Sequence, residues 1–488
     1  MSYTQYNIIF ALFENNLWIV ADPQKKTINT LSVVDFQKLH EETNIYIIFD
    51  QRKELLSAGN YVYFDLNHKY APAIDRITVC YGKSKIEAMI EYFLDERQND
   101  FNAHFNLIDK YRLPLWNIGK TTAHLSATLL GARHKMWMVE DKHPKDVLIN
   151  QYKNIEKEIG SSKFEAEIDG VNCKFGLGGI HGAREKYNAE GVFYNVDVVS
   201  MYPTIMIKDD LLSRSADKTR YKEIYNEKIK CKNKEYEYPL KIVLNATFGA
   251  MNEPHSELYD PNRFKDITKF GQLYILDLLE KLWMFDLIQT NTDSILVRLD
   301  SSKVWLGHSI EIVEQEFSNI CLKWQMRTGL TLSFEKIKKV FQKDVNNYLW
   351  ITEEDKIKAK GAYTNLAPDY NKQTRIIIRA LRDKIAYNKS IAKTIRECED
   401  RSEFMFFANV SDKFDGLYLG SKSLGSAVGV YATNNGEKLT KRNKRSGRLE
   451  KVAWSPAKCG TNFEDIDYSW YEEQTKKRLE SYGLKMGY

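Results

Sequence analysis

Residues 289–297 read QTNTDSILV, and this stretch sets two polar residues, Asn291 and Asp293, between apolar segments. Ile288 and Ile295 stand at positions typical of β-strands, and NTDS between them predicts the tight turn of a β-hairpin. A carboxylate at such a turn is also well placed to hold a metal ion. The rest of the chain must decide between a plain turn and a metal site.

The composition is that of an ordinary globular protein. The chain has 488 residues, 43% hydrophobic and 28% charged, with a formal net charge of +5. This length predicts about two to four structural units, and the mild positive charge is compatible with a polyanionic partner without requiring one. Six cysteines without a CxxC pair argue against a zinc site or a disulfide framework. No apolar run approaches the about 18 residues of a membrane helix, so we expect a cytoplasmic protein with no membrane partner.

A second carboxylate also ends an apolar strand. GVFYNVDVVSMYP (191–203) predicts a strand that runs into Asp197 and then a Tyr-Pro turn, and the Gly-rich FGLGGIHGA (175–183) before it predicts a hinge or close-approach loop. If Asp197 and Asp293 meet across neighbouring strands, their repulsion raises one pKa unless a cation lies between them. Two divalent ions about 3.5–4 Å apart would make such a pair a site for phosphoryl or nucleotidyl transfer. Oxygen ligands of this kind suit Mg²⁺.

A lysine-rich helical hairpin is predicted between the two carboxylates. DKTRYKEIYNEKIKCKNKEY (217–236) is typical of a polar helix, and YPLKIVLNATFGAMN (238–252) of a helix with an apolar face. Two pairs of residues are four apart, which puts each pair on one helical face: Lys228 with Lys232, and Lys241 with Asn245. The three lysines could clamp a triphosphate, while a solvated face is the ordinary alternative.

Periodicity predicts the remaining elements. The first 80 residues are rich in predicted strands and belong to an α/β unit over roughly 1–165. Further helices are predicted over 83–98, 123–138, 266–288 and 374–398, and strands over 330–351.

Three ordered motifs resemble those of family B DNA polymerases. DVVSMYPTI (197–205), KIVLNATFG (241–249) and NTDS (291–294) are similar to motifs A, B and C of that family, whose usual forms are DxxSLYPSI, KxxxNSxYG and DTDS. GLGGIHGA (176–183) and KGAY (360–363) are similar to the flanking signatures of its compact phage members. The resemblance implies a multidomain α+β and α/β fold: a right-hand palm–fingers–thumb polymerase behind an N-terminal RNase H-like, exonuclease-like domain.

The resemblance also implies domain limits and an activity. The limits are 1–165 (exonuclease-like domain), 166–215 (palm, first part), 216–252 (fingers hairpin), 253–369 (palm, second part) and 370–488 (thumb and C-terminal region). The activity is that of a DNA-templated DNA polymerase, which adds dNTPs to a primer 3′-OH by two-metal nucleotidyl transfer in phage genome replication. We expect two Mg²⁺ ions, with Mn²⁺ as a substitute, and a monomer that binds primer–template DNA, dNTP and phage replication accessory proteins.

The resemblance assigns the metal and nucleotide contacts position by position. Catalytic roles fall on Asp197, Asp293 and Lys241, with the two aspartates and the Val198 backbone as metal ligands. Tyr202 would stack under the sugar of the dNTP and leave no room for a 2′-hydroxyl. The other expected nucleotide contacts are Ser200 and Met201 (backbone, triphosphate), Lys228, Lys232 and Lys241 (phosphates), and Asn245 with Phe248 (under the nascent base pair).

The expected DNA contacts are more scattered. They are Thr292, Lys343, Tyr348, Lys360, and the residues Lys441, Arg442, Lys444 and Arg445 of the basic run 437–451 in the expected thumb. For this basic run a solvated, disordered loop is the alternative. Tyr348 falls where the family has a KxY element, although Asn346 replaces its lysine. Glu335 is either a further carboxylate near the site or a plain edge-strand residue.

Two departures from the family pattern affect function. Asn291 replaces the first Asp of DTDS, which lowers the negative charge of the site, and we expect the site still to work. In the exonuclease-like region, Phe10, Leu12 and Ala71 stand where the family has metal-binding carboxylates. Hydrophobic side chains cannot bind Mg²⁺, so we expect a domain that does not proofread; core strands of an unrelated unit are the alternative.

Other functions stay open. The short segment between motifs A and B favours conventional primer extension over protein priming. A non-catalytic DNA-binding subunit derived from a polymerase, and a repair or RNA-templated polymerase, are the alternatives to a replicative enzyme.

Overall fold

The computed structural model divides the chain into two compact units. The first unit comprises Met1–Lys120 with Asn365–Lys477, and the second comprises Thr121–Thr364 with Arg478–Tyr488. The structure describes residues 7–38, 44–49, 51–58, 61–66, 71–132, 164–176, 178–231, 234–301, 307–364, 366 and 374–484. The five domain limits expected from the sequence stay predictions.

The second unit is built on a nine-stranded antiparallel sheet. Its strands follow the order β14-β13-β12-β9-β11-β10-β8-β7-β6, so β9, β11 and β10 lie in the interior of the sheet. Their bounds are β6 (Phe164–Ile168), β7 (Val171–Gly176), β8 (Gly179–Ala183), β9 (Tyr187–Val198), β10 (Asp286–Asn291), β11 (Ser294–Arg298), β12 (Leu332–Asp344), β13 (Asn347–Thr352) and β14 (Ile357–Lys360). The strands predicted over 330–351 and the hairpin predicted around NTDS are both present.

Apolar side chains of the interior strands fix the register of this sheet. They form a buried cluster of Phe193, Ile288, Leu296, Ile337, Val340 and Trp350. A slip of one residue would turn each of these side chains to the opposite face of the sheet, where it would lose its packing partners. The register that burial imposes therefore also fixes where the polar strand ends lie.

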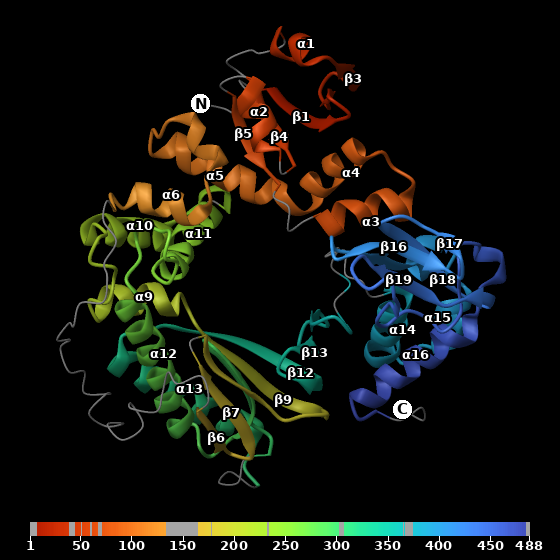
Figure 1. Cartoon of the computed structure of the whole chain (residues 1–488). Coiled ribbons are helices and arrows are strands. Elements are labelled where there is room, and N and C mark those ends of the chain that lie inside the picture. The colour runs from red at the N-terminus through yellow and green to blue at the C-terminus, as the bar shows by residue number, and fades with distance from the viewer. Residues whose placement is uncertain are drawn as a thin grey trace. The chain divides into compact units, whose positions relative to one another are not determined.

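The second unit also contains helices, and two of them, α10 and α11, form the predicted hairpin. Their bounds are α6 (Thr122–Leu129), α9 (Met201–Lys208), α10 (Lys218–Lys230), α11 (Lys234–Ala250), α12 (Pro261–Lys281) and α13 (Ile310–Thr328). Figure 1 shows the hairpin helices α10 and α11 next to α6, with α9 beside them.

Two predicted helices are shorter than expected. The helix predicted over 123–138 ends at Leu129, and residues 133–138 lie outside the described part of the chain. The helix predicted over 266–288 ends at Lys281, because the chain turns there and enters β10.

Two predicted loops are regular structure instead. Tyr202 and Pro203 lie in the first turn of α9, where proline is tolerated because its missing N–H has no intrahelical acceptor. The Gly-rich segment 175–183, predicted as a hinge or close-approach loop, contributes to β7 and β8. The hinge is wrong, but the close approach is present, because a Cβ on Gly179 would lie 2.8 Å from the Cα of Thr292.

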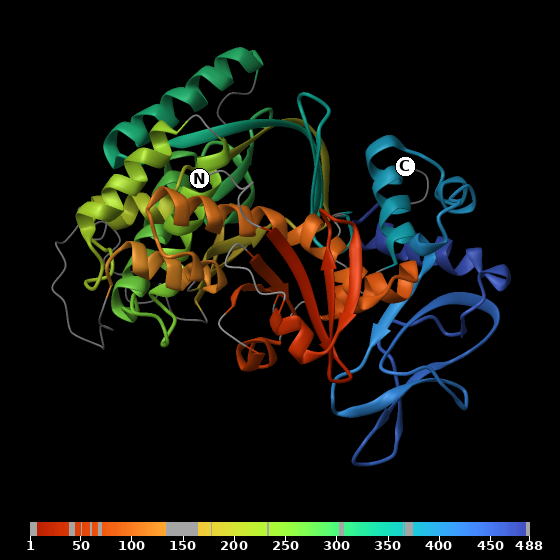
Figure 2. The same cartoon turned by 90° about the horizontal axis from the view of Figure 1, so that it is seen from above.

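The first unit contains a five-stranded mixed sheet in the order β3-β2-β1-β4-β5. β1 is antiparallel to β2 and parallel to β4, and β4 is parallel to β5. Figure 2 shows these strands side by side. The bounds are β1 (Asn7–Glu14), β2 (Leu17–Asp22), β3 (Thr27–Leu31), β4 (Asn44–Ile48) and β5 (Val62–Asp65), with α1 (Val33–Lys38), α2 (Arg52–Ala58), α3 (Ala71–Tyr81), α4 (Lys85–Tyr92), η3 (Phe93–Arg97), α5 (Gln98–Lys110) and η4 (Leu115–Gly119).

The C-terminal part of the first unit carries the basic run. The helix predicted over 374–398 is divided, because Asn388 takes a left-handed conformation and ends α14. The elements are α14 (Arg375–Tyr387), α15 (Ile391–Arg396), η5 (Arg401–Phe404), β15 (Phe406–Asn409), β16 (Phe414–Leu419), β17 (Lys422–Ser423), β18 (Ala427–Glu437), β19 (Leu439–Asn443), β20 (Leu449–Lys451), β21 (Cys459–Gly460), η6 (Phe463–Asp465) and α16 (Tyr468–Ser481), the last of which runs into the second unit. Within 437–451, β19 and β20 pair as a hairpin, so the alternative of a disordered loop is wrong.

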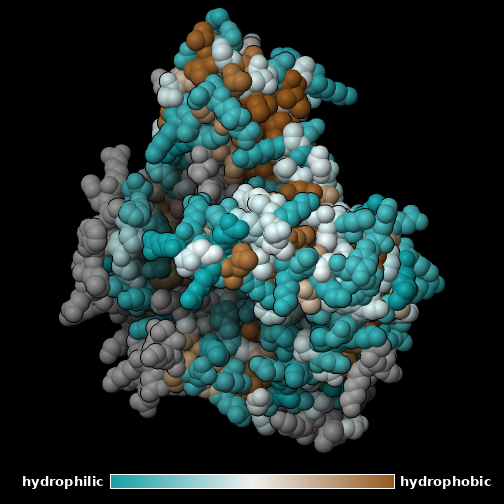
Figure 3. Space-filling view, turned by 45° about the vertical axis from the view of Figure 1, so that its right-hand side comes forward, coloured by the Kyte–Doolittle hydropathy of each residue, from teal (hydrophilic) through white to brown (hydrophobic). Residues whose placement is uncertain are grey.

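Among the described residues, none of the helices has the length and apolar character needed to cross a bilayer. The face drawn in Figure 3 is mostly hydrophilic, with apolar residues in small groups.

Candidate active site

Strand pairing brings the two candidate carboxylates together. In the β9–β11 ladder, Asp197 is directly opposite Ser294, the residue that follows Asp293. The backbone N–H of Val198 donates to the carbonyl oxygen of Asp293 at 2.8 Å. The two aspartates therefore lie at the same end of adjacent strands.

Ionisation of the two carboxyl groups is unfavourable at this end of β9 and β11. Burial, and then the negative charge of Asp293, raise the pKa of Asp197 to about 6. Burial also raises the pKa of Asp293. A half-buried carboxylate pair of this kind favours a bound cation, because the cation offsets both the lost hydration and the repulsion.

Three lysines provide positive charge around the pair. Lys241 on α11 lowers the pKa of both aspartates, while Lys358 acts on Asp197 and Lys360 on Asp293. Lys358 and Lys360 share one face of β14 because they are two residues apart in a strand. Lys358 was not among the predicted site residues. Its spacing of two residues from Lys360, a predicted site residue, could have placed it on the same face of the strand. The ammonium of Lys358 also lies 2.6 Å from Glu335, which places that carboxylate near the site.

The donor set fits Mg²⁺. Within the described ranges, no group of three or more His, Cys, Asp or Glu side chains could form an all-protein cage for a metal. Mg²⁺ needs no such cage, since it keeps several waters and is usually held by one or two carboxylates together with substrate phosphates. Asp197 and Asp293 supply those carboxylates, and the Val198 backbone stands directly beside them.

The start of α9 lies against the fingers hairpin. Ser200 takes a left-handed conformation (φ 50°) at the N-cap of α9, and Met201 is buried behind it. The ammonium of Lys228 on α10 donates to the Ser200 hydroxyl at 3.2 Å. Two of the predicted nucleotide contacts, Lys228 and Ser200, therefore lie side by side. Lys232 lies outside the described residues.

Tyr202 belongs to a stack of aromatic rings. Its ring lies 4.2 Å from that of Phe248, which in turn lies 4.6 Å from that of Phe264. Gly271 on α12 makes room, because a Cβ there would lie 3.0 Å from the Tyr202 ring. The Tyr202 hydroxyl is buried without a hydrogen-bond partner among the described residues. Burial and the charge of Asp293 raise its pKa, so the hydroxyl lies within the field of that carboxylate.

Helix α11 presents the other predicted nucleotide contacts on one face. Lys241, Asn245 and Phe248 are spaced four and three residues apart, which aligns them along the helix. Lys241 and Asn245 are exposed, and Phe248 is half-buried against Tyr202. The face therefore carries a cation, an amide and an aromatic ring in that order.

Of the DNA contacts predicted in the second unit, Thr292 lies in the turn between β10 and β11, and the other three lie on β12–β14. Tyr348 is directly opposite Lys360 in the β13–β14 ladder and stacks on Trp350 at 4.1 Å. Lys343 lies 3.1 Å from Asp344 and 4.8 Å from the centre of the Tyr363 ring. Tyr348 and Lys360 are therefore neighbours, and Lys343 is engaged within the protein.

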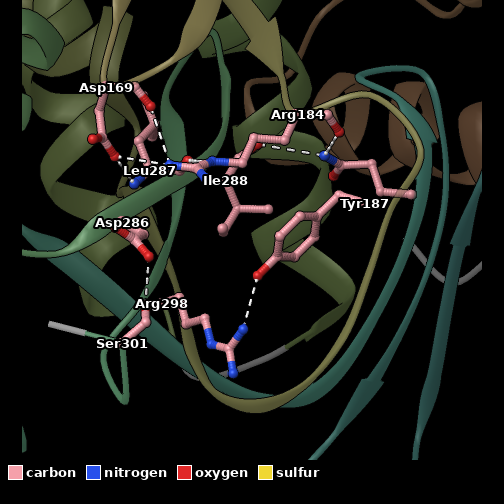
Figure 4. A network of polar contacts seen from close by, with 9 residues as sticks. Asp169, Arg184, Tyr187, Asp286, Leu287, Ile288, Arg298 and Ser301 are labelled. Carbon is pink, nitrogen blue, oxygen red and sulfur yellow. Dashed lines mark hydrogen bonds and ion pairs between the residues drawn. The ribbon is translucent and has the colours of Figure 1, made fainter.

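A polar network supports the strands that carry the aspartates (Figure 4). The Arg184 guanidinium donates to the carbonyl oxygens of Leu287 (2.6 Å) and Asp169 (3.1 Å). The Asp169 carboxylate accepts from the N–H of Leu287 at 2.7 Å. Farther along, Arg298 donates to the Tyr187 hydroxyl at 3.3 Å. These bonds tie the β6–β7 turn and the residue that follows β8 to β10, and they tie β9 to β11. None was foreseen from the sequence.

The remaining predicted residues lie in the first unit. Lys441 stands over the Phe414 ring at 4.1 Å and Arg442 over the Tyr418 ring at 4.2 Å. Lys444 and Arg445 are exposed in the β19–β20 turn.

The positions where the exonuclease motif would have metal-binding carboxylates hold apolar residues. Phe10 and Leu12 on β1 are 1% and 0% exposed and belong to a hydrophobic cluster, in which Phe10 packs edge-on against Phe93. Ala71 begins α3, and the description of the structure does not extend to its side chain.

No protein-family model matches the chain, and no curated protein matches it. Among solved structures, the chain is similar to the family B DNA polymerase from the hyperthermophilic archaeon Pyrobaculum calidifontis. The TM-score is 0.46 at 13% sequence identity, and the match covers 98% of this chain and 77% of the archaeal chain.

The raised pKa of Asp197 gives a pH-dependent stability. Its value of about 6 lies above the ordinary 3.8, so the folded state binds the extra proton and the free energy of unfolding falls as pH rises from about 4 to 6. Asp197→Asn should therefore stabilise the metal-free protein at pH 8 by about 1 kcal/mol, after allowance for solvent screening, and by less at pH 5.

Thermal melts in a chelating buffer measure this effect. Glu185→Gln, a change at an exposed carboxylate of the same unit, serves as the control with which the Asp197→Asn melts are compared. An Asp197→Asn advantage that is equal at both pH values, or absent, would contradict the burial argument.

Proposed function

We propose that the chain is a DNA-templated DNA polymerase that adds dNTPs to a primer 3′-OH by two-metal nucleotidyl transfer. The observation that carries this proposal is the convergence of Asp197 and Asp293 at one end of adjacent strands, with Lys241, Lys358 and Lys360 around them. Paired carboxylates with raised pKa, surrounded by cations, are suited to a reaction in which negative charge develops on phosphate oxygens.

Separate residues would bind the metal ions and the phosphates. Asp197 and Asp293 would hold two Mg²⁺ ions, for which Mn²⁺ could substitute, with the Val198 carbonyl as a further ligand. When bound, the ions would activate the attacking hydroxyl and neutralise charge on the phosphates. Lys241 would bind the triphosphate and offset the charge of the leaving pyrophosphate. Most of the rate would come from positioning and electrostatics, with little covalent chemistry from side chains.

The contacts around α9 and α11 support a nucleotide pocket beside the aspartates. Lys228 and the Ser200–Met201 backbone would face the triphosphate, because the ammonium already reaches the Ser200 hydroxyl. Tyr202 would form the floor under the sugar. Its ring is fixed by Phe248, so it could not move aside for a 2′-hydroxyl, which favours dNTP over rNTP.

The DNA contacts are proposed on both units. Thr292, Lys343, Tyr348 and Lys360 would contact DNA near the site, and the β19–β20 hairpin would contact phosphates without sequence preference. We also propose that the chain is a phage replication enzyme. It would act as a monomer with accessory proteins and start from an ordinary primer.

A non-catalytic DNA-binding subunit is the second candidate. Asn291 favours it, because a site that lost one carboxylate could have lost catalysis. The pairing of Asp197 with Asp293, and the aligned face of Lys241, Asn245 and Phe248, favour the active enzyme instead.

Primer extension separates these candidates. The wild-type chain should extend a labelled primer on a DNA template with Mg²⁺ and dNTPs. Asp293→Asn should lower the single-turnover rate by about 10³-fold or more, as the loss of several kcal/mol of charge stabilisation implies.

Glu185→Gln is the control for this assay, and an RNA template run in parallel tests the alternative template. Extension by Asp293→Asn at the wild-type rate would exclude the proposed site. An inactive wild-type chain that still binds primer–template would favour the binding subunit.

The first unit should not shorten a primer. Phe10 and Leu12 bring packed hydrophobic side chains to the positions where metal-binding carboxylates would be needed. Incubation with Mg²⁺ and a 3′-mismatched primer, without dNTPs, should leave the primer length unchanged. Mg²⁺-dependent loss of 3′ nucleotides would overturn this part of the proposal.

Neutralising the basic hairpin should weaken DNA binding. The quadruple change of Lys441, Arg442, Lys444 and Arg445 to Ala should lower primer–template affinity. The slope of log K against log salt should become shallower by about 0.9 for each lost phosphate contact. Fluorescence anisotropy over a salt series measures this.

A charge-retaining variant, with Lys and Arg exchanged at the same four positions, is the matched control and should keep the wild-type slope. An unchanged slope in the neutral variant would place the duplex contacts elsewhere.

A further inference from the structure

His181 contacts the residue that departs from the expected DTDS motif. Strand β8 pairs with β10 so that His181 lies directly opposite Asn291. The imidazole Nδ1 lies 3.1 Å from the amide oxygen of Asn291. Because an amide oxygen only accepts, this bond requires the proton on Nδ1 of the ring.

The same segment also holds the turn that follows Asn291. The N–H of Thr292 donates to the carbonyl oxygen of Ile180 at 2.9 Å, and its hydroxyl donates to that of Gly178 at 3.0 Å. Gly179, at φ +114°, leaves space for the Thr292 backbone, which a Cβ would approach to 2.8 Å. Residues 178–181, here called the turn clamp, therefore fix Thr292 by two hydrogen bonds and a close contact.

Asn291 connects the turn clamp to Asp293. Within the turn, the N–H of Asp293 donates to the carbonyl oxygen of Asn291 at 2.9 Å, and the Ser294 hydroxyl donates to the same oxygen at 3.2 Å. The Asn291 side chain is bound to β8 while its backbone holds the Asp293 N–H. A shift of Asn291 would therefore move the carboxylate of Asp293.

An amide at position 291 suits the charge of this site. Burial raises the pKa of both Asp197 and Asp293, so a third carboxylate beside them would add to the cost of ionisation. The Asn291 amide offers His181 the same acceptor oxygen without that charge.

We propose that His181 is a positioning residue for Asp293 that acts through Asn291. Asn291 stands at the position of the first carboxylate of DTDS, and its hydrogen bond to His181 holds the turn in place. The proposal rests on the proposed polymerase function for its kinetic consequence, and on the hydrogen bond alone for its structural one.

Two measurements test the pair, with variants His181→Ala, Asn291→Ala, the double variant and His181→Gln, whose side-chain amide can still donate. Hydrogen–deuterium exchange followed on a peptide covering 288–297 reports the turn directly. Single-turnover primer extension reports the chemical step, and separate titrations give the nucleotide KM and the primer–template Kd.

Both single alanine variants should exchange faster over this peptide and should lose about tenfold in the single-turnover rate, as expected for one hydrogen bond. KM and Kd should stay near their wild-type values. The double variant should lose no more than either single variant, because both changes remove the same interaction. His181→Gln should recover most of the rate.

Other results would overturn the proposal. They are wild-type exchange in His181→Ala, additive losses in the double variant, or a loss confined to primer affinity. If the wild-type chain extends no primer, the proposed function fails, while the exchange measurement still decides whether His181 holds the turn.

Discussion

The candidate site depends on one antiparallel register, the pairing of β9 with β11. This register sets Asp197 opposite Ser294 and leaves the Val198 N–H bonded to the carbonyl oxygen of Asp293. It is imposed by buried apolar side chains along the same strands, because a slip of one residue would reverse the face of each of them. Core packing thereby holds two carboxylates close together, although their repulsion alone would drive them apart.

The electrostatics of the site follow from that enforced proximity. The folded chain keeps two carboxyl groups where burial makes ionisation unfavourable, and it surrounds them with lysines from α11 and β14. The aromatic stack of Tyr202, Phe248 and Phe264 gives the same region a rigid apolar wall. A polyphosphate with bound divalent ions would complement all three features, since it brings positive charge to the carboxylates and negative charge to the lysines.

Much of this arrangement could be predicted from the sequence because it is local. Alternation of apolar residues and the polar NTDS predict the β10–β11 hairpin, and helical spacing places Lys241 and Asn245 on one face. Other features depend on the order of strands, which the pattern does not contain. Lys358 reaches the site because β14, β13 and β12 follow β9 in the sheet, and His181 meets Asn291 because β8 pairs with β10. The Gly-rich segment misled the prediction for a related reason: Gly179 and Gly182 lie in the paired strand β8 and allow close packing against neighbouring strands.

The central claim is that Asp197 and Asp293 converge to share divalent ions. Crystals grown with Mn²⁺ and a primer–template test it most directly, through anomalous diffraction collected at the manganese edge. The account predicts an anomalous peak within coordination distance of both carboxylates, and its loss in Asp293→Asn. Carboxylates that point to separate regions, or manganese bound only elsewhere on the chain, would contradict it.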